Sequence, residues 1–222
     1  MSVSLARRAA FETVRRVFEQ DAYADRAFPS AAAGLDRRDR ALAQRLAYGT
    51  IQRVRTLDHG IEALGRRPVR KLDPPVRAAL RLGAYQLAFS EVAQHAAVNE
   101  SVELVREVGL ERAVSFTNAV MRRLALGLRE LVDSLPQATP GEAALRHSYP
   151  DWVAEAWWRD FGPEDALALM RAQNEPPETV VRVNARRCGV ADLPGRLDPE
   201  IPGALHVDRV DPLGAEVSTL DQ

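Results

Sequence analysis

The sequence is poor in cysteine, lysine and histidine, and these scarcities exclude several kinds of site. Cys188 is the single cysteine among 222 residues, which excludes an internal disulfide and a zinc site built from several thiolates. The four histidines are far apart, and no two are separated by four residues, so we expect no metal site. Lys71 is the single lysine among 30 basic residues. Positive charge is therefore carried almost entirely by arginine.

Long apolar runs are also absent. Arg, Glu or Gln interrupts every apolar stretch before it reaches the ~18–20 residues that span a bilayer, which excludes a membrane protein. The first residues lack the apolar core of a signal peptide, and Glu12 and Glu19 argue against a transit peptide, so we expect a cytoplasmic protein. With 46% hydrophobic residues, the chain has enough apolar side chains to fold around a core.

The sequence lacks the motifs that bind nucleotide cofactors or carry a nucleophilic serine. No Gly-x-Gly-x-x-Gly follows a strand, and neither Gly-x-x-x-x-Gly-Lys-Ser/Thr nor Gly-x-Ser-x-Gly occurs. Cys188 has no histidine nearby to act as a base and is interpreted as an incidental small residue. Glu100 and Glu103 share a helical face that we interpret as solvated. The sequence therefore predicts no catalytic residue and no cofactor bound by this chain.

The net charge of −1 hides a division along the chain. Residues 1–127 carry 21 Lys and Arg against 14 Asp and Glu, whereas residues 128–222 carry 9 against 17. A surface for an anionic partner is therefore expected in the first part. A composition rich in arginine is also what a GC-rich genome produces, and an excess of surface charge is most often a solvated face. Charge alone leaves these interpretations open.

Apolar residues at steps of three and four predict an all-α bundle before residue 130. The expected helices cover residues 4–20, 23–33, 36–65, 74–89, 96–108 and 111–126. In the third helix, Arg38, Arg45 and Gln52 recur every seven residues and share the outer face. The helix over 74–89 is apolar on nearly all sides, which predicts a central position. The last helix is expected to stop at Gly127.

The pattern changes after residue 130. Three prolines, a glycine and small polar residues punctuate residues 131–150, which are expected to form a linker. Short helices are expected over 152–161 and 163–173, joined at Gly162, and a strand over 179–183. The remaining residues predict loops and short apolar runs, and we expect the chain to stop in the middle of a domain.

Several separated motifs resemble one family of RNA-binding domains. They are Arg40–Thr50 (RALAQRLAYGT), Leu82–Phe89 (LGAYQLAF), His95–Glu103 (HAAVNESVE) and Phe116–Arg123 (FTNAVMRR). Together they resemble the NusB-like RNA-binding domain. Downstream, HSYPDW from His147, QNEPP from Gln173 and VRVN from Val181 are similar to the segment before the catalytic domain of the RsmB (Sun/Fmu) family, the 16S rRNA cytosine-C5 methyltransferases.

The resemblance implies a mainly α chain: a NusB-like all-α helical bundle over 1–130, a linker over 131–150, and over 151–222 a small α+β segment, part of the methyltransferase N-terminal subdomain. It also implies S-adenosylmethionine as the cofactor of the whole family protein and 16S rRNA as its RNA partner. The family's two cysteines and its cofactor loop have no counterpart here, and Cys188 matches neither cysteine. We therefore expect this chain to dock RNA for a catalytic domain that it lacks and to be inactive alone, whether the gene continues beyond residue 222 or the chain is naturally short.

Seven arginines are expected to contact RNA phosphates, which position the RNA without specifying its sequence. They are Arg7, Arg8, Arg15, Arg38, Arg45, Arg122 and Arg123. A further basic group, Arg66, Arg67, Arg70 and Lys71, marks a loop.

Two rival functions stay open. One is a NusB-type RNA-binding transcription antitermination factor, against which residues 147–184 count, since such a factor would end near residue 130. The other is a helical protein-interaction adaptor with merely solvated arginines. RNA binding that weakens with salt would favour a phosphate-binding surface over the adaptor. The sequence does not decide the target nucleotide, the RNA affinity or whether the bundle forms a homodimer.

Overall fold

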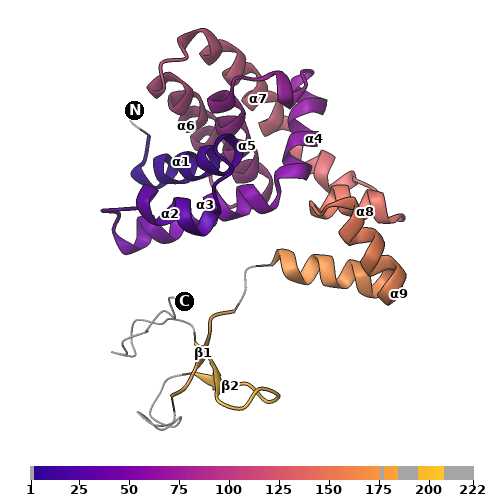
Figure 1. Cartoon of the computed structure of the whole chain (residues 1–222). Helices are drawn as coiled ribbons and strands as arrows, with labels where there is room; N and C mark the ends of the chain where they lie inside the picture. The colour runs from indigo at the N-terminus through magenta and orange to yellow at the C-terminus, as the bar shows by residue number, and fades with distance from the viewer. Residues whose placement is uncertain (1–2, 176–177, 185–194, 208–222) are drawn as a thin grey trace. The chain divides into compact units, whose positions relative to one another are not determined.

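The computed structural model describes residues 3–175, 178–184 and 195–207, and it divides the chain into two compact units, Met1–Arg171 and Ala172–Gln222. The helices are α1 (Leu5–Glu19), α2 (Ala24–Ala31), α3 (Arg37–Gln52), α4 (Val54–Gly65), the 3₁₀ helix η1 (Val69–Lys71), α5 (Pro74–Phe89), α6 (Gln94–Glu107), α7 (Glu111–Ser134), α8 (Pro140–His147) and α9 (Asp151–Asn174). The strands are β1 (Val180–Arg182), β2 (Arg196–Leu197) and β3 (Ala204–His206). The predicted class, mainly α with a small α+β segment, is confirmed (Figure 1).

We call the first unit, Met1–Arg171, the helical unit, and the second, Ala172–Gln222, the sheet unit. Helix α5 is the centre of the helical unit, as its apolar pattern predicts. It packs against α1, α3, α4, α6 and α7, which surround it in Figure 1. Leu80 and Leu82 are fully buried. Gly83 allows close approach of the neighbouring helices, because a Cβ at this position would lie 2.4 Å from Ser101 Oγ and 2.5 Å from Met121 Cε. Such close packing fixes how α6 and α7 lie against α5.

The single long helix expected over residues 36–65 is wrong. Arg53, with φ −94° and ψ 10°, separates α3 from α4. Hydrogen bonds hold the start of α4 in its new direction: Arg55 N donates to Ser148 Oγ at 3.0 Å, and Thr56 Oγ1 donates to the carbonyl of Leu145 at 2.7 Å. One non-helical residue hardly disturbs an apolar repeat of three and four, so the sequence pattern passes through the break.

Helix α7 continues beyond Gly127, where the sequence predicts its end. A glycine inside a helix costs only about 1 kcal/mol relative to alanine. Leu128 and Val132, which follow it, are both buried. Burying two such side chains favours continuation by more than the glycine opposes it.

The predicted linker also contains a helix. Thr139 accepts a hydrogen bond from Glu142 N at 3.3 Å, and the Glu142 side chain accepts from Thr139 N at 3.0 Å, a reciprocal cap at the start of α8. Pro140 is the first residue of this helix, where its missing N–H costs nothing. Proline here therefore marks a helix start rather than an extended linker.

The remaining elements largely agree with the sequence. Gly162, with φ 79°, breaks α9 into the two predicted helical pieces. The predicted strand appears as β1, and the sheet order is β1-β3-β2 with antiparallel pairing of Val180 to His206 and of Leu197 to Leu205. Strands β2 and β3 lie where loops were expected, because runs of two and three residues are too short to show alternation. Cys188 lies outside the described residues.

The described residues include neither a membrane-spanning helix nor a cluster of metal ligands. No helix among them has the length and apolar content needed to cross a membrane. No group of three or more His, Cys, Asp or Glu side chains in this part of the chain is arranged to hold a metal ion.

Candidate nucleic-acid interface

The seven arginines predicted to contact RNA do not form one surface, and Arg7 is buried. The Arg7 side chain lies between α1, α5 and α6: Nε donates to Gln86 Oε1 at 2.6 Å, and Nη1 lies 3.0 Å from Glu100 Oε1. Arg7 is 8% exposed. Its guanidinium joins three helices and is poorly placed for the predicted phosphate contact.

Arg8 and Arg15 are also paired with carboxylates. Arg8 donates from Nε and Nη2 to the two carboxylate oxygens of Glu107, at 2.8 and 2.6 Å, and this hydrogen-bonded pair raises the pKa of Arg8. Arg15 Nη2 lies 3.1 Å from Glu19 Oε2, and its Nη1 lies 3.6 Å from Glu12 Oε2. Because each positive charge has a carboxylate beside it, α1 offers little net charge to a phosphate.

The other four predicted arginines are exposed. Arg38 and Arg45 lie on the outer face of α3 with Gln52, as their seven-residue spacing predicts. Arg122 and Arg123 lie on α7, and Arg123 Nη1 donates to the carbonyl of Leu64 at 3.5 Å. Among the described residues, none of these four forms an ion pair. This second group is therefore the part of the prediction that the fold leaves available to an anion.

Arg122 and Arg123 on α7 lie near the basic loop that follows α4, since Arg123 contacts Leu64 close to the end of α4. Arg66 ends α4 in the left-handed conformation, with φ 55°. The loop then folds back as η1, where Val69 N donates to Glu62 Oε1 at 2.8 Å. This arrangement places the loop's basic side chains beside α7. We call the exposed group the α4–α7 basic surface; it comprises Arg66, Arg67, Arg70, Lys71, Arg112, Arg122 and Arg123.

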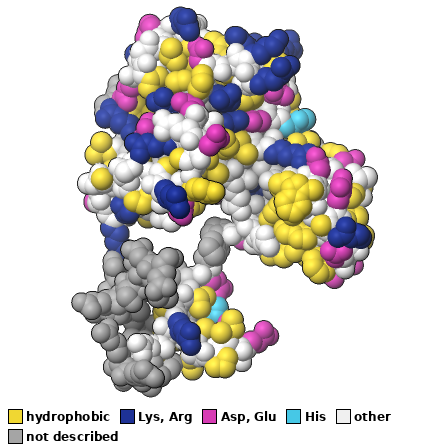
Figure 2. Space-filling model, in the orientation of Figure 1, with side chains coloured by type: hydrophobic (Ala, Val, Ile, Leu, Met, Phe, Trp, Pro, Cys, Tyr) yellow, Lys and Arg dark blue, Asp and Glu magenta, His cyan; other side chains and the backbone are white. Residues whose placement is uncertain are grey.

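The face drawn in Figure 2 agrees with this placement: dark-blue side chains gather over the end of α4 and the segment that follows it. The carboxylates close to this surface are few. Asp73 lies 3.2 Å from Arg112, Glu62 accepts a backbone N–H, and Glu111 lies 3.4 Å from Arg106. The surface thus keeps a net positive charge, which α1 does not.

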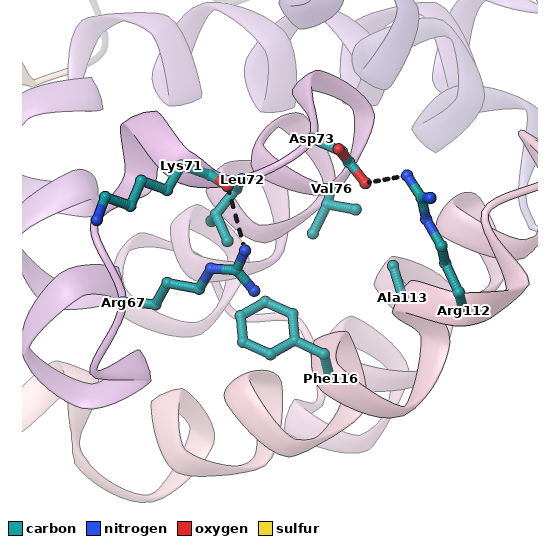
Figure 3. Close-up of a pocket in the computed structure, with 8 residues that line it drawn as sticks. All are labelled: Arg67, Lys71, Leu72, Asp73, Val76, Arg112, Ala113 and Phe116. Carbon is teal, nitrogen blue, oxygen red and sulfur yellow. Dashed lines mark hydrogen bonds and ion pairs between the residues drawn. The ribbon is translucent and has the colours of Figure 1, made fainter.

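A cavity of about 310 Å³ opens within the α4–α7 basic surface, between η1, the start of α5 and the start of α7 (Figure 3). Arg67 Nη2 donates to the carbonyl of Lys71 at 3.4 Å, and the Arg67 guanidinium lies 5.5 Å from the centre of the Phe116 ring. The lining residues are Arg67, Lys71, Leu72, Asp73, Val76, Arg112, Ala113 and Phe116. Cationic groups and an aromatic ring therefore share one cavity.

Sequence reasoning did not assign Phe116 or Arg112 to this site. Phe116 is placed by its helical pattern among the inward residues of α7, and it is in fact half-buried and lines the cavity. The spacing of Arg112, Phe116 and Arg123, four and seven residues apart, puts them on one face of a helix. That spacing was the available signal, but it identifies a site only once the loop after α4 is known to fold against the same face.

Two families match consecutive parts of the chain. Residues 4–126 match the NusB family. Residues 149–204 match the ferredoxin-like domain described as Methyltr_RsmF/B-like. The first match covers helices α1 to α6 and the α4–α7 basic surface, and the second covers α9, β1, β2 and the first residue of β3.

Curated relatives extend these matches. The chain is 33% identical over 223 residues to methyltransferase Rv1407 of Mycobacterium tuberculosis, covering 93% of this chain and 48% of that protein. It is 31% identical over 180 residues to ribosomal RNA small subunit methyltransferase B of Pseudomonas putida, covering 81% of this chain and 40% of that protein. The chain thus spans about half the length of the relatives it matches.

Solved structures share the fold. Protein PH0851 superposes with a TM-score of 0.63 at 16% identity, over 92% of this chain and 48% of that one. NusB of T. maritima superposes with a TM-score of 0.51 at 22% identity, over 57% of this chain and 94% of that one. A similar match, with a TM-score of 0.51 at 23% identity, covers 55% of this chain and 94% of a chain in a crystal of NusB and NusE with double-stranded RNA.

Proposed function

Because the chain belongs to the NusB family, matched over residues 4–126, we propose that it docks small-subunit ribosomal RNA for a methyltransferase. In this proposal the whole protein is an S-adenosylmethionine-dependent 16S rRNA (cytosine-C5)-methyltransferase. This chain contributes RNA binding and does not itself hold the cofactor. A homodimer through the helical bundle is a separate proposal, which sedimentation of the chain at micromolar concentration tests.

The observation that carries the proposal is the order of the two family matches. The NusB match precedes the Methyltr_RsmF/B-like ferredoxin-like match in one chain. The same chain aligns with relatives named ribosomal RNA small subunit methyltransferase B, such as the one from Pseudomonas putida. A NusB-type antitermination factor, the nearest rival, leaves the second match without a role.

The exposed arginines supply the RNA contacts in this proposal. Arg122 and Arg123 belong to the α4–α7 basic surface, and Arg38 and Arg45 form a smaller exposed pair on α3. Arginine suits phosphate because its planar fork can donate two hydrogen bonds to one group. We assign Arg7, Arg8 and Arg15 a structural role instead, since each already has a carboxylate partner.

The test is RNA binding by the whole chain as a function of salt. A 16S rRNA fragment should bind with an affinity whose logarithm falls linearly with the logarithm of salt concentration, because cations bound to phosphate are released. Replacing Arg122 and Arg123 together by Gln should reduce that slope by about one to two. Arg159→Gln is the matched control, because Arg159 is exposed and pairs with Asp160 on α9.

The outcomes separate the candidate functions. A reduced slope for the double variant with an unchanged slope for the control supports docking through the α4–α7 basic surface. RNA binding that is absent or indifferent to salt overturns the proposal and favours the adaptor.

A further inference from the structure

The cavity within the α4–α7 basic surface has two kinds of wall. Arg67, Lys71 and Arg112 bring positive charge, whereas Leu72, Val76, Ala113 and Phe116 are apolar. Figure 3 shows the Phe116 ring and the Arg67 guanidinium facing the same space from α7 and from the loop after α4. A volume of about 310 Å³ is at the lower end of the range for small-molecule sites. The cavity therefore fits a small ligand that has a charged part and an apolar part.

The charges select an anion. Asp73 is the single carboxylate in the lining, and it lies 3.2 Å from Arg112. Arg67 and Lys71 have no carboxylate partner among the described residues, and their side chains are exposed. Figure 3 draws the Lys71 side chain extending away from the Arg67 guanidinium. Both side chains are long and exposed on one short loop, so Lys71 can turn toward a phosphate that Arg67 binds.

The aromatic ring of Phe116 narrows the class of anion that fits the cavity. A simple anion would use the cationic side chains but would leave the apolar wall of the cavity without a contact. The Arg67 guanidinium lies 5.5 Å from the centre of that ring, so a guanidinium plane and an aromatic face are side by side. These are the two kinds of side-chain surface on which unpaired RNA bases stack. A nucleotide offers both the phosphate and the aromatic base that this cavity can receive.

The position of the cavity distinguishes a nucleotide in a chain from a free one. Arg112, Phe116 and Arg123 lie on one face of α7, and the exposed Arg66 and Arg70 each precede a lining residue, Arg67 and Lys71, on the loop. A ribose-phosphate backbone can follow these exposed cations on either side of the cavity, whereas a free nucleotide has no use for them. A paired base cannot enter, because its face is covered by its neighbours in the duplex.

We infer that this cavity binds one unpaired nucleotide of the docked RNA, with its phosphate on Arg67 and Lys71 and its base against Phe116. The inference rests on the proposed function and adds to it a preference for single-stranded RNA. The α4–α7 basic surface holds the backbone, and the cavity holds a base.

The test compares single-stranded and duplex RNA of equal length by fluorescence anisotropy, using the whole chain. Phe116→Leu should weaken binding of the single strand about tenfold and leave duplex binding unchanged, because loss of one base-stacking contact has this size of effect. Phe116→Tyr should retain single-strand affinity. Phe18→Leu is the matched control, since Phe18 lies 4.4 Å below a guanidinium, that of Arg81, in another part of the helical unit.

A second variant guards against a folding defect at Phe116, whose ring also packs on the core. Arg67 and Lys71 are exposed, so replacing both by Gln should preserve the thermal melt. The same double variant should reduce the slope of log affinity against log salt concentration for the single strand by about one to two. Ultraviolet cross-linking followed by peptide mass spectrometry should place a nucleotide on the peptide that contains Phe116.

Each result decides a separate statement. RNA binding that is insensitive to both variants overturns the nucleotide site and leaves the docking function intact, whereas absence of RNA binding overturns both. Uridine monophosphate and adenosine monophosphate, added as free nucleotides, are the competing probes. The inference is wrong if these nucleotides bind at micromolar concentration, Phe116→Leu weakens their binding, and the affinity for single-stranded RNA is the same in the variants as in the unchanged chain. The cavity would then bind a free nucleotide.

Discussion

Two histidines, one in each unit of the chain, have pKa values shifted in opposite directions. His147 in the helical unit is buried at the end of α8, and burial lowers its pKa to about 4, with Arg53, Arg146 and Arg171 adding repulsion. His206 in the sheet unit lies between two carboxylates, and its hydrogen bond to Asp198 raises its pKa. Burial therefore disfavours the charged form of His147, whereas two carboxylates at the surface of the small sheet favour the charged form of His206.

The two units also differ in what stabilises them. One continuous apolar core runs through α1 to α7, with side chains such as Leu46, Leu80 and Leu124 almost fully buried. The sheet buries few apolar side chains, Leu205 and Val207 among them, and its strands are two or three residues long. So short a sheet depends more on polar contacts such as the pair of carboxylates around His206.

The largest expected effect comes from the core of the helical unit. Leu80→Ala should lower its free energy of unfolding by about 2–5 kcal/mol, because a cavity is left in the centre of α5. Leu126→Ala is the matched control, since Leu126 is 87% exposed on α7 and its truncation should change stability little. Urea unfolding followed by far-ultraviolet circular dichroism measures both. Equal losses for the two variants would contradict a core centred on α5.

Acid should weaken the helical unit through His147. Its pKa is about 4 in the folded state and near 6.5 in the unfolded chain, so the unfolded chain binds more protons between these values. The stabilisation is complete above about pH 6.5 and is lost as the pH falls toward 4, by about 2 kcal/mol. Unfolding in urea at pH 7.5 and 4.5 tests this, with His147→Gln as the variant that should flatten the difference. Equal free energies of unfolding at pH 7.5 and 4.5 would contradict the predicted effect of His147.

The smallest expected effect is in the sheet, whose stability should fall as the pH rises rather than as it falls. The pKa of His206 is raised, so its bridge is complete below about pH 6.5 and is lost as the pH rises through the folded-state value. Asp198, whose pKa is lowered to about 2 by His206 and by the N–H groups of Glu200 and Ile201, keeps its charge throughout this range. Arg196 opposes the shift of His206 but does not cancel it.

Nuclear magnetic resonance titration of the two imidazoles measures this contrast directly. His206 should titrate above the usual histidine value and His147 well below it, and Asp198→Asn should bring the pKa of His206 down. If both histidines titrated together near 6.5, the two environments would not differ as described.

Much of the helical architecture was predictable because it depends on local periodicity. The central position of α5 follows from a helix that is apolar on nearly all sides, and the exposed face of Arg38 and Arg45 follows from their spacing. The errors share a cause. Arg53, Gly127 and Pro140 are helix-ending or neutral signals in isolation, and contacts made elsewhere in the fold decided whether a helix stopped or started there.

The candidate site was predictable only in part for a similar reason. Arg15 pairs with Glu12 and Glu19 on its own helix, at spacings of three and four that the sequence displays. Arg7 and Arg8 differ, because their carboxylate partners Glu100 and Glu107 are more than ninety residues away in sequence. No local pattern reveals such a pairing. Conversely, Phe116 follows an inward helical pattern, and only the fold shows that the loop after α4 leaves its ring at the edge of a cavity.

The sequence by itself determined the helical class of this chain, its positive first part and its likeness to a family of RNA-binding domains, since periodicity, composition and motifs are carried by neighbouring residues. The tertiary structure alone decided which arginines are neutralised and which remain available to an anion. Electrostatic attraction falls off with distance in space rather than along the chain, so the usable charge of a side chain is fixed only when distant segments fold against one another.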